Sequence, residues 1–300
     1  MSDLLWGIDL GGTKIEGAVI QTTPELQIID RQRVPTEASE GYDHILSQIQ
    51  KLIQQISEKA GTKPTKLGIG TPGIVDKDTQ LIKNSNTLGL IGRPMKKDLE
   101  ALLGIEVTMA NDANCFAMAE ALLGAVPDIV KNPEVVFGVI LGTGVGSGIV
   151  VNGKVIHGKH GIGGEWGHNI LDESGDLCYC GKKGCVEMFI SGPACEKYYY
   201  KLSGKKLIAS DIYKLHTEGD SAASETMNRF IHYFGKALAT VINIIDPEVI
   251  VFGGGIGKMD LIYNEGREEV KKYIFNYDLR THFIKPKLGD SAGVIGAALL

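Results

Sequence analysis

The chain has 300 residues, of which 43% are hydrophobic and 22% are charged. This length and composition exclude a disordered chain, a collagen and a disulfide scaffold, and they allow one large domain or two of about 150 residues each. Lysine and arginine total 31 against 36 aspartate and glutamate residues, a net charge of −5 without any basic run. Neither nucleic acid nor a membrane is therefore an expected partner.

The sequence also argues against a membrane span and a targeting peptide. The longest apolar stretch, residues 135–151, is interrupted by glycine and threonine and falls short of the roughly 20 residues that cross a bilayer. The first residues, Met-Ser-Asp-Leu-Leu-Trp, lack the basic region of a signal or transit peptide. We expect a cytoplasmic protein.

Apolar runs that end in glycine turns predict buried strands at residues 6–20, 136–151 and 249–255. The first two runs continue into a second strand after the turn, and the second run ends at Asn152-Gly153, a strong hairpin signal. This repeat, at a spacing near half the chain, indicates two similar halves that meet at a cleft. A shift in composition near residues 125–133 is the best candidate for their boundary.

Apolar residues at helical spacing predict a helix over residues 43–60, and Gly61 follows it as a C-terminal cap. A strand is expected at residues 67–70, and further helices at 112–123 and 222–245. Alternating strands and helices are typical of an α/β protein.

One glycine pattern is misleading. The segment 68–73, Gly-Ile-Gly-Thr-Pro-Gly, follows a strand and matches the dinucleotide-binding fingerprint. That fingerprint requires a helix to begin at the glycines, and residues 74–80 carry no helical pattern, so a Rossmann site is disfavoured. A Walker A sequence is absent.

Two glycine turns are candidates for binding phosphate. In Asp9-Leu-Gly-Gly-Thr-Lys14, glycine amide groups and a threonine hydroxyl can face an anion, and Gly142-Thr-Gly-Val-Gly146 has the same equipment. Either turn alone is explained equally well as a tight hairpin. Two copies in corresponding places favour a nucleotide phosphate.

A carboxylate stands at the start of the helix that follows the strand 106–109. Asp112, after Asn111, lies where an acidic residue caps a helix. The same place, at the carboxyl end of a strand, is where α/β sheets expose reactive groups. The spacing leaves both interpretations open.

Three cysteines within eight residues form the most specific motif. Cys178, Cys180 and Cys185 follow His168, and one imidazole with three thiolates is the ligand set of a closed, tetrahedral structural zinc site. The alternative is a chance cluster of free thiols. Cys115 and Cys195 are expected to be buried small residues.

Taken together, these motifs resemble the ROK family of sugar kinases and sugar-responsive repressors, over essentially the whole chain. The motifs are Asp9–Lys14, Asn111–Asn114, Leu141–Gly146, Gly164–His168, Cys178–Glu187 and Gly253–Gly255. The resemblance implies a two-lobed actin- and hexokinase-like (ribonuclease H-like) α/β fold with a cleft between duplicated halves. It places residues 1–125 and a terminal helix at 290–300 in the first lobe, and residues 126–289 with the zinc loop in the second.

The resemblance also implies a role for each motif residue in an ATP-dependent hexose 6-kinase. Asp112 would be the catalytic base, and the sugar would be bound by Asn86, Asn111, Asp112, Glu165, His168 and Glu187. Asp9 would act near Mg²⁺, while Gly11, Gly12, Thr13, Lys14, Gly142, Thr143, Gly144 and Gly146 would hold phosphates and Gly253, Gly254 and Gly255 would lie against adenosine. Zn²⁺ would be held by His168, Cys178, Cys180 and Cys185, with the second ring nitrogen of His168 directed towards the sugar. A homodimer is also implied.

The motifs look most like those of bacterial fructokinases that also accept mannose, so fructose is the first expected substrate. N-acetylglucosamine kinases and then glucokinases of the same family are the alternatives. A sugar-sensing repressor of this family would carry a helix-turn-helix domain before the first strand, and only a few residues precede Trp6. A degenerate relative would have lost the base or a phosphate turn, and neither is missing. The sequence therefore favours the enzyme.

Overall fold

The computed structural model describes residues 4–85 and 87–300, and they divide into two compact units. The first unit contains residues 1–124, 155–163 and 288–300, and the second contains residues 125–154 and 164–287. The segment 155–163, predicted to belong to the second lobe, belongs to the first unit instead. Within the described ranges, none of the helices is both long and apolar enough to cross a membrane.

The first unit is built on a five-stranded sheet with the order β3-β2-β1-β4-β7. Its strands are β1 (Leu5–Leu10), β2 (Lys14–Gln21), β3 (Gln27–Pro35), β4 (Lys66–Thr71) and β7 (Glu106–Asn111). β1 pairs antiparallel with β2 and parallel with β4. A small separate sheet pairs β5 (Ile74–Val75) with β6 (Ile82–Lys83). No helix begins at the glycines after β4, as expected for a chain without a Rossmann site.

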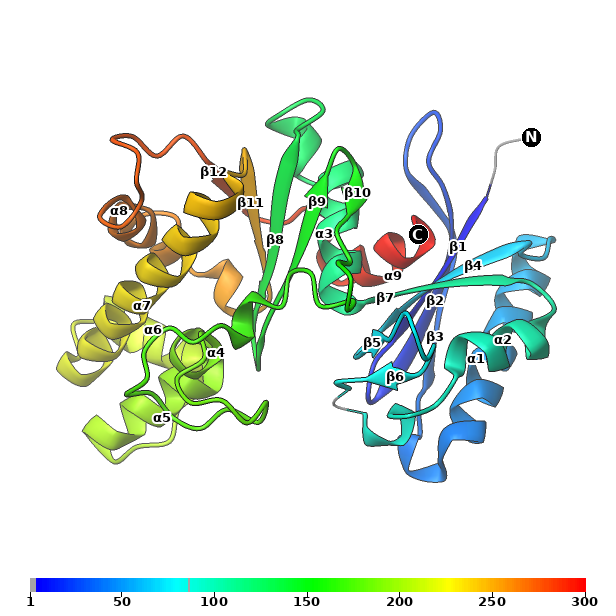
Figure 1. Ribbon diagram of the computed structural model, residues 1–300, viewed down its shortest axis with the longest axis horizontal. Coiled ribbons are helices and arrows are strands. Elements are labelled where there is room, and N and C mark those ends of the chain that lie inside the picture. Colours follow the sequence, from blue (N-terminus) through cyan, green and yellow to red (C-terminus); the bar gives the residue numbers. More distant parts are fainter. Residues whose placement is uncertain (1–3, 86) are drawn as a thin grey trace. The chain divides into compact units, whose positions relative to one another are not determined.

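Helices cover both faces of this sheet (Figure 1). They are α1 (Tyr42–Ala60), α2 (Met95–Leu103), α3 (Asp112–Leu122) and α9 (Ala292–Ala298), with short 3₁₀ turns η1 (Ala38–Glu40), η2 (Leu88–Leu90) and η7 (Gly289–Ser291). α1 packs on β2 and β3, and α9 packs on β1, β4 and α3. α9 lies so close to β4 that a Cβ atom at Gly68 would overlap the backbone of Ala297. This close approach explains why glycine stands in the middle of β4.

The second unit repeats this topology, with the sheet order β10-β9-β8-β11-β12. Its strands are β8 (Val135–Leu141), β9 (Val145–Val151), β10 (Lys154–Val155), β11 (Val249–Gly253) and β12 (His282–Ile284). β8 pairs antiparallel with β9 and parallel with β11. The turn between β9 and β10 has positive φ at Asn152 and Gly153, as the hairpin signal predicts. The predicted α/β fold with duplicated halves is confirmed.

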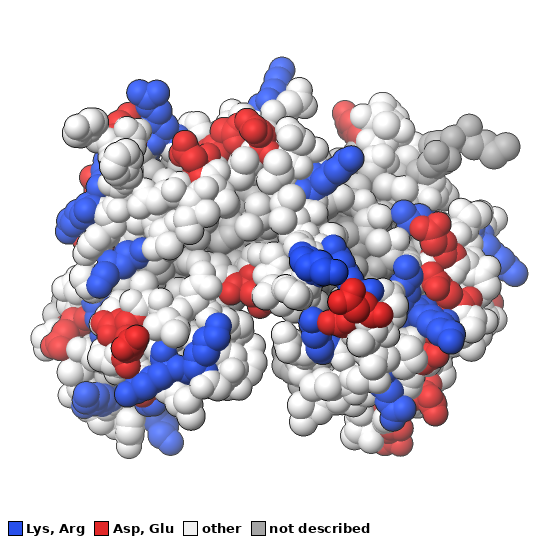
Figure 2. Space-filling model, viewed as in Figure 1, with Lys and Arg blue, Asp and Glu red and all other residues white. Residues whose placement is uncertain are grey.

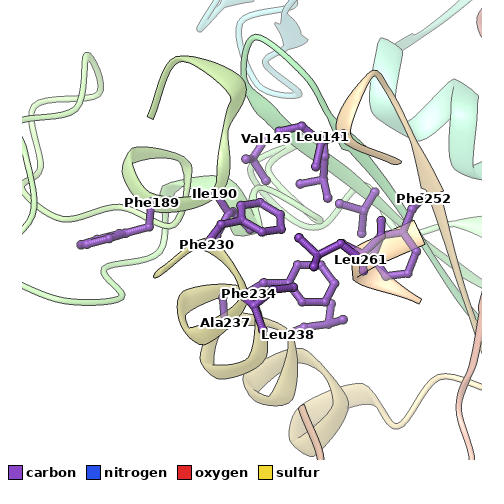
Figure 3. Packing of buried hydrophobic residues seen from close by; sticks show 14 of the residues in the cluster. Leu141, Val145, Phe189, Ile190, Phe230, Phe234, Ala237, Leu238, Phe252 and Leu261 are labelled. Atoms are coloured by element: carbon purple, nitrogen blue, oxygen red, sulfur yellow. The ribbon is translucent and has the colours of Figure 1, made fainter. Parts of the chain in front are cut away.

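A large apolar core holds the helices of the second unit on its sheet. These elements are α4 (Glu187–Ile190), α5 (Gly192–Ser203), α6 (Ala209–Thr217), α7 (Ser221–Ile245) and α8 (Glu265–Lys271), with 3₁₀ turns η3 (Val126–Asp128), η4 (Trp166–His168), η5 (Ile256–Lys258) and η6 (Asp260–Ile262). Phe230, Phe234 and Leu238, at helical spacing on α7, meet Leu141 of β8 and its neighbours in this core (Figure 3). The predicted helices 43–60 and 222–245 correspond to α1 and α7.

Candidate active site and metal centre

Two carboxylates of the first unit lie near each other at the ends of parallel strands. Asp9 lies near the end of β1, and Asp112 begins α3 directly after β7. The N-cap is Asn111, whose Oδ1 accepts a hydrogen bond from the backbone N–H of Asn114 at 2.8 Å. Asn111 therefore caps the helix, and Asp112 does not. The side chain of Asp112 is accessible to solvent.

The surroundings of both carboxylates favour their protonated forms. Desolvation raises the pKa of Asp112, although the backbone N–H of Ala113 donates a hydrogen bond to its carboxylate. Burial first, and then the negative charges of Asp112 and Glu16, raise the pKa of Asp9 to about 6. A divalent cation would relieve this repulsion, and carboxylate oxygen is the ligand that Mg²⁺ prefers. The residues therefore fit a magnesium site.

The cationic side chains near Asp9 already contact another carboxylate, that of Glu16. Glu16, almost fully buried on β2 opposite Asp9, accepts a hydrogen bond from Arg31 Nε at 2.5 Å and another from Arg33. Lys14 Nζ lies 3.8 Å from the same carboxylate. The ammonium group of Lys14 is thus within ion-pair distance of the buried Glu16, while about half of the Lys14 side chain (51%) is exposed.

The two glycine turns occupy equivalent positions between β1 and β2 and between β8 and β9. The N–H of Gly11 donates to the carbonyl of Lys14 at 2.9 Å, and the N–H of Gly142 donates to that of Gly144 at 3.0 Å. These two amide groups close the turns instead of facing a ligand. Gly12, Thr13 and Thr143 are exposed. In the second unit, Gly253 ends β11, and Gly254 has a φ of 79°.

The carboxylate and imidazole groups expected to bind sugar come from the second unit. Glu165 precedes η4, and Trp166 fixes this turn by donating its indole N–H to the carbonyl of Ala237 at 3.2 Å. Glu187 begins α4 and accepts a hydrogen bond from the backbone N–H of Val145 at 2.9 Å. The second glycine turn therefore holds one of these carboxylates directly.

Four side chains of the second unit form a compact ligand set. One ligand atom from each of His168, Cys178, Cys180 and Cys185 lies within 4.8 Å of all the others. Cys178 Sγ is 3.5 Å from His168 Nδ1, and Cys180 Sγ is 3.5 Å from Cys185 Sγ. With Zn–S near 2.3 Å and Zn–N near 2.0 Å, a tetrahedral zinc ion separates its ligand atoms by about 3.5 to 3.8 Å. The residues present fit a structural zinc ion.

Tyr179, between two of these cysteines, was missed by the sequence analysis. Its hydroxyl lies 2.9 Å from His168 Nε2, and the two rings meet edge to face with centroids 5.0 Å apart. Partial desolvation, followed by the charges of Glu187, Cys178 and Glu165, raises the pKa of Tyr179 to about 12. The outward nitrogen of His168 is therefore paired with a tyrosine here, and that tyrosine lies near both carboxylates. Its position inside the cysteine motif was the available signal.

The residues predicted to form the active site are divided between the two units. Asp9, Asn111 and Asp112 belong to the first unit, and Glu165, His168 and Glu187 belong to the second. Asn86 lies outside the described residues. Cys115 and Cys195 are buried, as expected. On the face in Figure 2, acidic and basic side chains lie interspersed, in keeping with the small net charge.

The ROK family model matches residues 5–300, and the chain belongs to this family. Among solved structures, the ROK hexokinase of Thermus thermophilus has a TM-score of 0.88 and 30% identity, with 99% of this chain and 97% of that chain covered. A ROK family glucokinase from Streptomyces griseus, in complex with glucose and AMPPNP, has a TM-score of 0.78 and 26% identity over 99% and 98% of the two chains. These likenesses confirm the actin- and hexokinase-like fold class.

A more specific likeness comes from an N-acetyl-D-glucosamine kinase of Vibrio atlanticus (strain LGP32). It is 38% identical to this chain, and the alignment covers 99% of each protein. A second such kinase, from Aliivibrio fischeri, is 36% identical over the same shares. These relatives do not support the expectation that the protein is a fructokinase. The alternative, an N-acetylglucosamine kinase, fits them better.

Proposed function

We propose that the protein is an ATP-dependent kinase that phosphorylates the 6-hydroxyl group of N-acetyl-D-glucosamine. The observation that carries the reaction is the Asp112 carboxyl group, which is accessible to solvent at the carboxyl end of a parallel strand and has a raised pKa. The choice of sugar is supported by the named relatives that match nearly the whole chain. Fructose, mannose and glucose are the alternative substrates.

Asp112 acts as the general base in this proposal. Its carboxylate accepts the proton of the 6-hydroxyl group while the sugar oxygen attacks the γ-phosphorus of ATP, and the bond to the β-phosphate oxygen breaks to release ADP. A base works best when its pKa lies near the working pH, and the desolvation of Asp112 moves its pKa in that direction.

The phosphates are assigned to the two glycine turns, with the exposed residues Gly12, Thr13 and Thr143 as hydrogen-bond donors. Gly253, Gly254 and Gly255 are assigned to adenosine. When bound near Asp9, Mg²⁺ supplies positive charge that offsets the phosphate oxygens and the repelling carboxylates. Phosphoryl transfer needs positioning more than covalent help, so these groups and one base suffice.

The sugar is assigned to Asn111 and Asp112 of the first unit and to Glu165, His168 and Glu187 of the second, with Asn86 as a further candidate. Ionised carboxylates accept hydrogen bonds only, and sugar hydroxyls donate them. Zinc, held by His168 and the three cysteines, would fix the ring of His168. A homodimer stays a prediction.

The test is a coupled ADP-release assay with Mg·ATP that compares kcat/KM for N-acetylglucosamine, N-acetylmannosamine, glucose, mannose and fructose. N-acetylglucosamine should lead by tenfold or more. A lead for fructose would overturn the assignment of the sugar but keep the mechanism. No turnover of any sugar would overturn the kinase and favour a sugar sensor.

A further inference from the structure

Glu16 is a buried carboxylate that the proposed mechanism does not use. It lies on β2 and is 1% exposed. Arg31 Nε donates to its Oε1 at 2.5 Å, and Arg33 Nε donates to its Oε2. Lys14 Nζ lies 3.8 Å from the same Oε2. A buried charge is tolerated only when it is paired and hydrogen-bonded, and here three positive charges converge on one negative charge.

The same carboxylate lies directly opposite Asp9. Asp9 of β1 pairs with Glu16 in the antiparallel register, and Glu16 pairs with Arg33 of β3, so the three side chains lie on one face of the sheet. Like charges that face each other on neighbouring strands are destabilising. After burial and Asp112, the charge of Glu16 raises the pKa of Asp9, whereas Lys14 and Arg33 lower it. Glu16 therefore does not stabilise the charge of Asp9 directly, and its role there depends on the cations that it binds.

Arg33 is the cation best placed to exchange Glu16 for Asp9. Neighbouring strands lie about 4.8 Å apart, so about 10 Å separates the backbones of Asp9 and Arg33, and an extended arginine side chain covers most of this distance. Arg31 is held a second time, because its Nη1 donates to Ser291 Oγ at 2.6 Å. Within the described ranges, the side chain of Arg33 makes no hydrogen bond except to Glu16, and it forms no ion pair with Asp9.

We propose that Glu16 is a positioning residue that holds Arg33 away from Asp9 and so leaves the Asp9 carboxylate open to a divalent cation. An arginine paired with Asp9 would occupy the oxygens that Mg²⁺ prefers and would place a like charge beside that ion. α9 encloses the carboxylate from another side, because a Cβ atom at Gly293 would lie 2.6 Å from Asp9 Oδ2. This inference rests on the assignment of Mg²⁺ to Asp9 in the proposed function.

The experiment titrates Mn²⁺, as a substitute for Mg²⁺, into nucleotide-free protein and measures the unbound Mn²⁺ by electron paramagnetic resonance. The wild type should bind Mn²⁺, and Asp9→Asn should lose it. Glu16→Gln should raise the Kd for Mn²⁺ tenfold or more, because Arg33 then pairs with Asp9. The double variant Glu16→Gln/Arg33→Gln removes that competitor and should return the Kd to within threefold of the wild type. Glu269→Gln, which removes a carboxylate paired with Lys272 in the second unit, is the matched control and should keep the Kd.

The double variant separates competition for Asp9 from a purely structural role of Glu16. If Glu16 only stabilises the sheet, the double variant binds Mn²⁺ at least as weakly as Glu16→Gln, and the proposal fails. An unchanged Kd in Glu16→Gln would also overturn it, and so would a wild type that binds no Mn²⁺.

A second comparison applies if circular dichroism shows that Glu16→Gln has lost its fold. The double variant is then compared with Arg33→Gln, and the two Kd values should agree within threefold because the competitor is absent from both. A tenfold difference would overturn the proposal. The titration requires neither sugar nor turnover, so its failure is distinguishable from a failure of the ADP-release assay that tests the proposed function.

Discussion

The two glycine turns occupy equivalent places in their sheets, but different side chains surround them. Each turn joins the central strand of a five-stranded sheet to its antiparallel neighbour, in sheets of equivalent order. The first turn lies beside Asp9, a carboxyl group whose pKa is raised by burial and then by the charges of Asp112 and Glu16. The second turn holds Glu187 through the N–H of Val145. Duplication therefore explains the backbone of both turns, while side chains from other segments decide which ligand each can serve.

The largest effect is expected at the first unit's reactive carboxylate. Asp112→Asn should lower kcat by about 10²- to 10⁴-fold, since that is the usual contribution of a general base, and KM values should change by only a few-fold. The coupled ADP-release assay measures both. Asp211→Asn, at an exposed position of α6, is the control. Ordinary activity of Asp112→Asn would end the assignment of the base.

In the second unit, sugar binding should depend on the zinc ion. Cys180→Ser removes one of four ligands, so zinc, measured by elemental analysis of purified protein, should fall from one equivalent to a small fraction. Sugar binding, measured by calorimetry, should be lost with it because His168 loses its orientation. Cys195→Ala lies outside the cluster and should keep its zinc. Fully active protein without zinc would contradict the site.

Asp9 gives a pH-dependent test of the first turn. Because its pKa of about 6 in the folded protein is above the ordinary aspartate value of 3.8, the carboxyl group favours folding at low pH, and this contribution is lost as pH rises through 6. Asp9→Asn should therefore raise the free energy of unfolding at pH 8, by at most about 3 kcal/mol, and by less at pH 5. Urea denaturation without Mg²⁺ measures this difference. Equal changes at both pH values would show that the pKa of Asp9 is not raised in the folded protein.

Adding a methyl group at Gly144 or at Gly142 should show which part of the second turn positions Glu187. A Cβ atom at Gly144 would lie 2.7 Å from Glu187 Oε2, whereas one at Gly142 would meet no atom within 4 Å. Gly144→Ala should displace Glu187 and raise KM for the sugar about tenfold, the equivalent of roughly 1.4 kcal/mol. Gly142→Ala should leave KM for the sugar unchanged. Equal effects would show that the turn does not position Glu187.

The smallest effect is expected at Tyr179. A sugar hydroxyl that binds His168 Nε2 has to displace the tyrosine hydroxyl, and an exposed hydrogen bond of this kind contributes little. Tyr179→Phe should therefore lower KM for the sugar about two- to threefold, with zinc content unchanged. A higher KM would mean that Tyr179 binds the sugar itself.

Local patterns in the sequence determined the elements and one of the sites. Helical spacing located α1 and α7, and the Asn152-Gly153 pair located a hairpin, because these signals depend on neighbouring residues alone. The metal ligands fall within residues 168–185, so their clustering is largely local as well. For the same reason the family could be recognised from short motifs in chain order.

Only the tertiary structure decided which distant groups meet. The raised pKa of Asp9 depends on burial and then on Asp112, which lies far along the chain, and Glu187 meets a backbone amide 42 residues away. The segment 155–163 joined the first unit although it follows a strand of the second. Burial and Coulomb interactions depend on every atom that surrounds a group, and periodicity along a chain carries no information about those atoms.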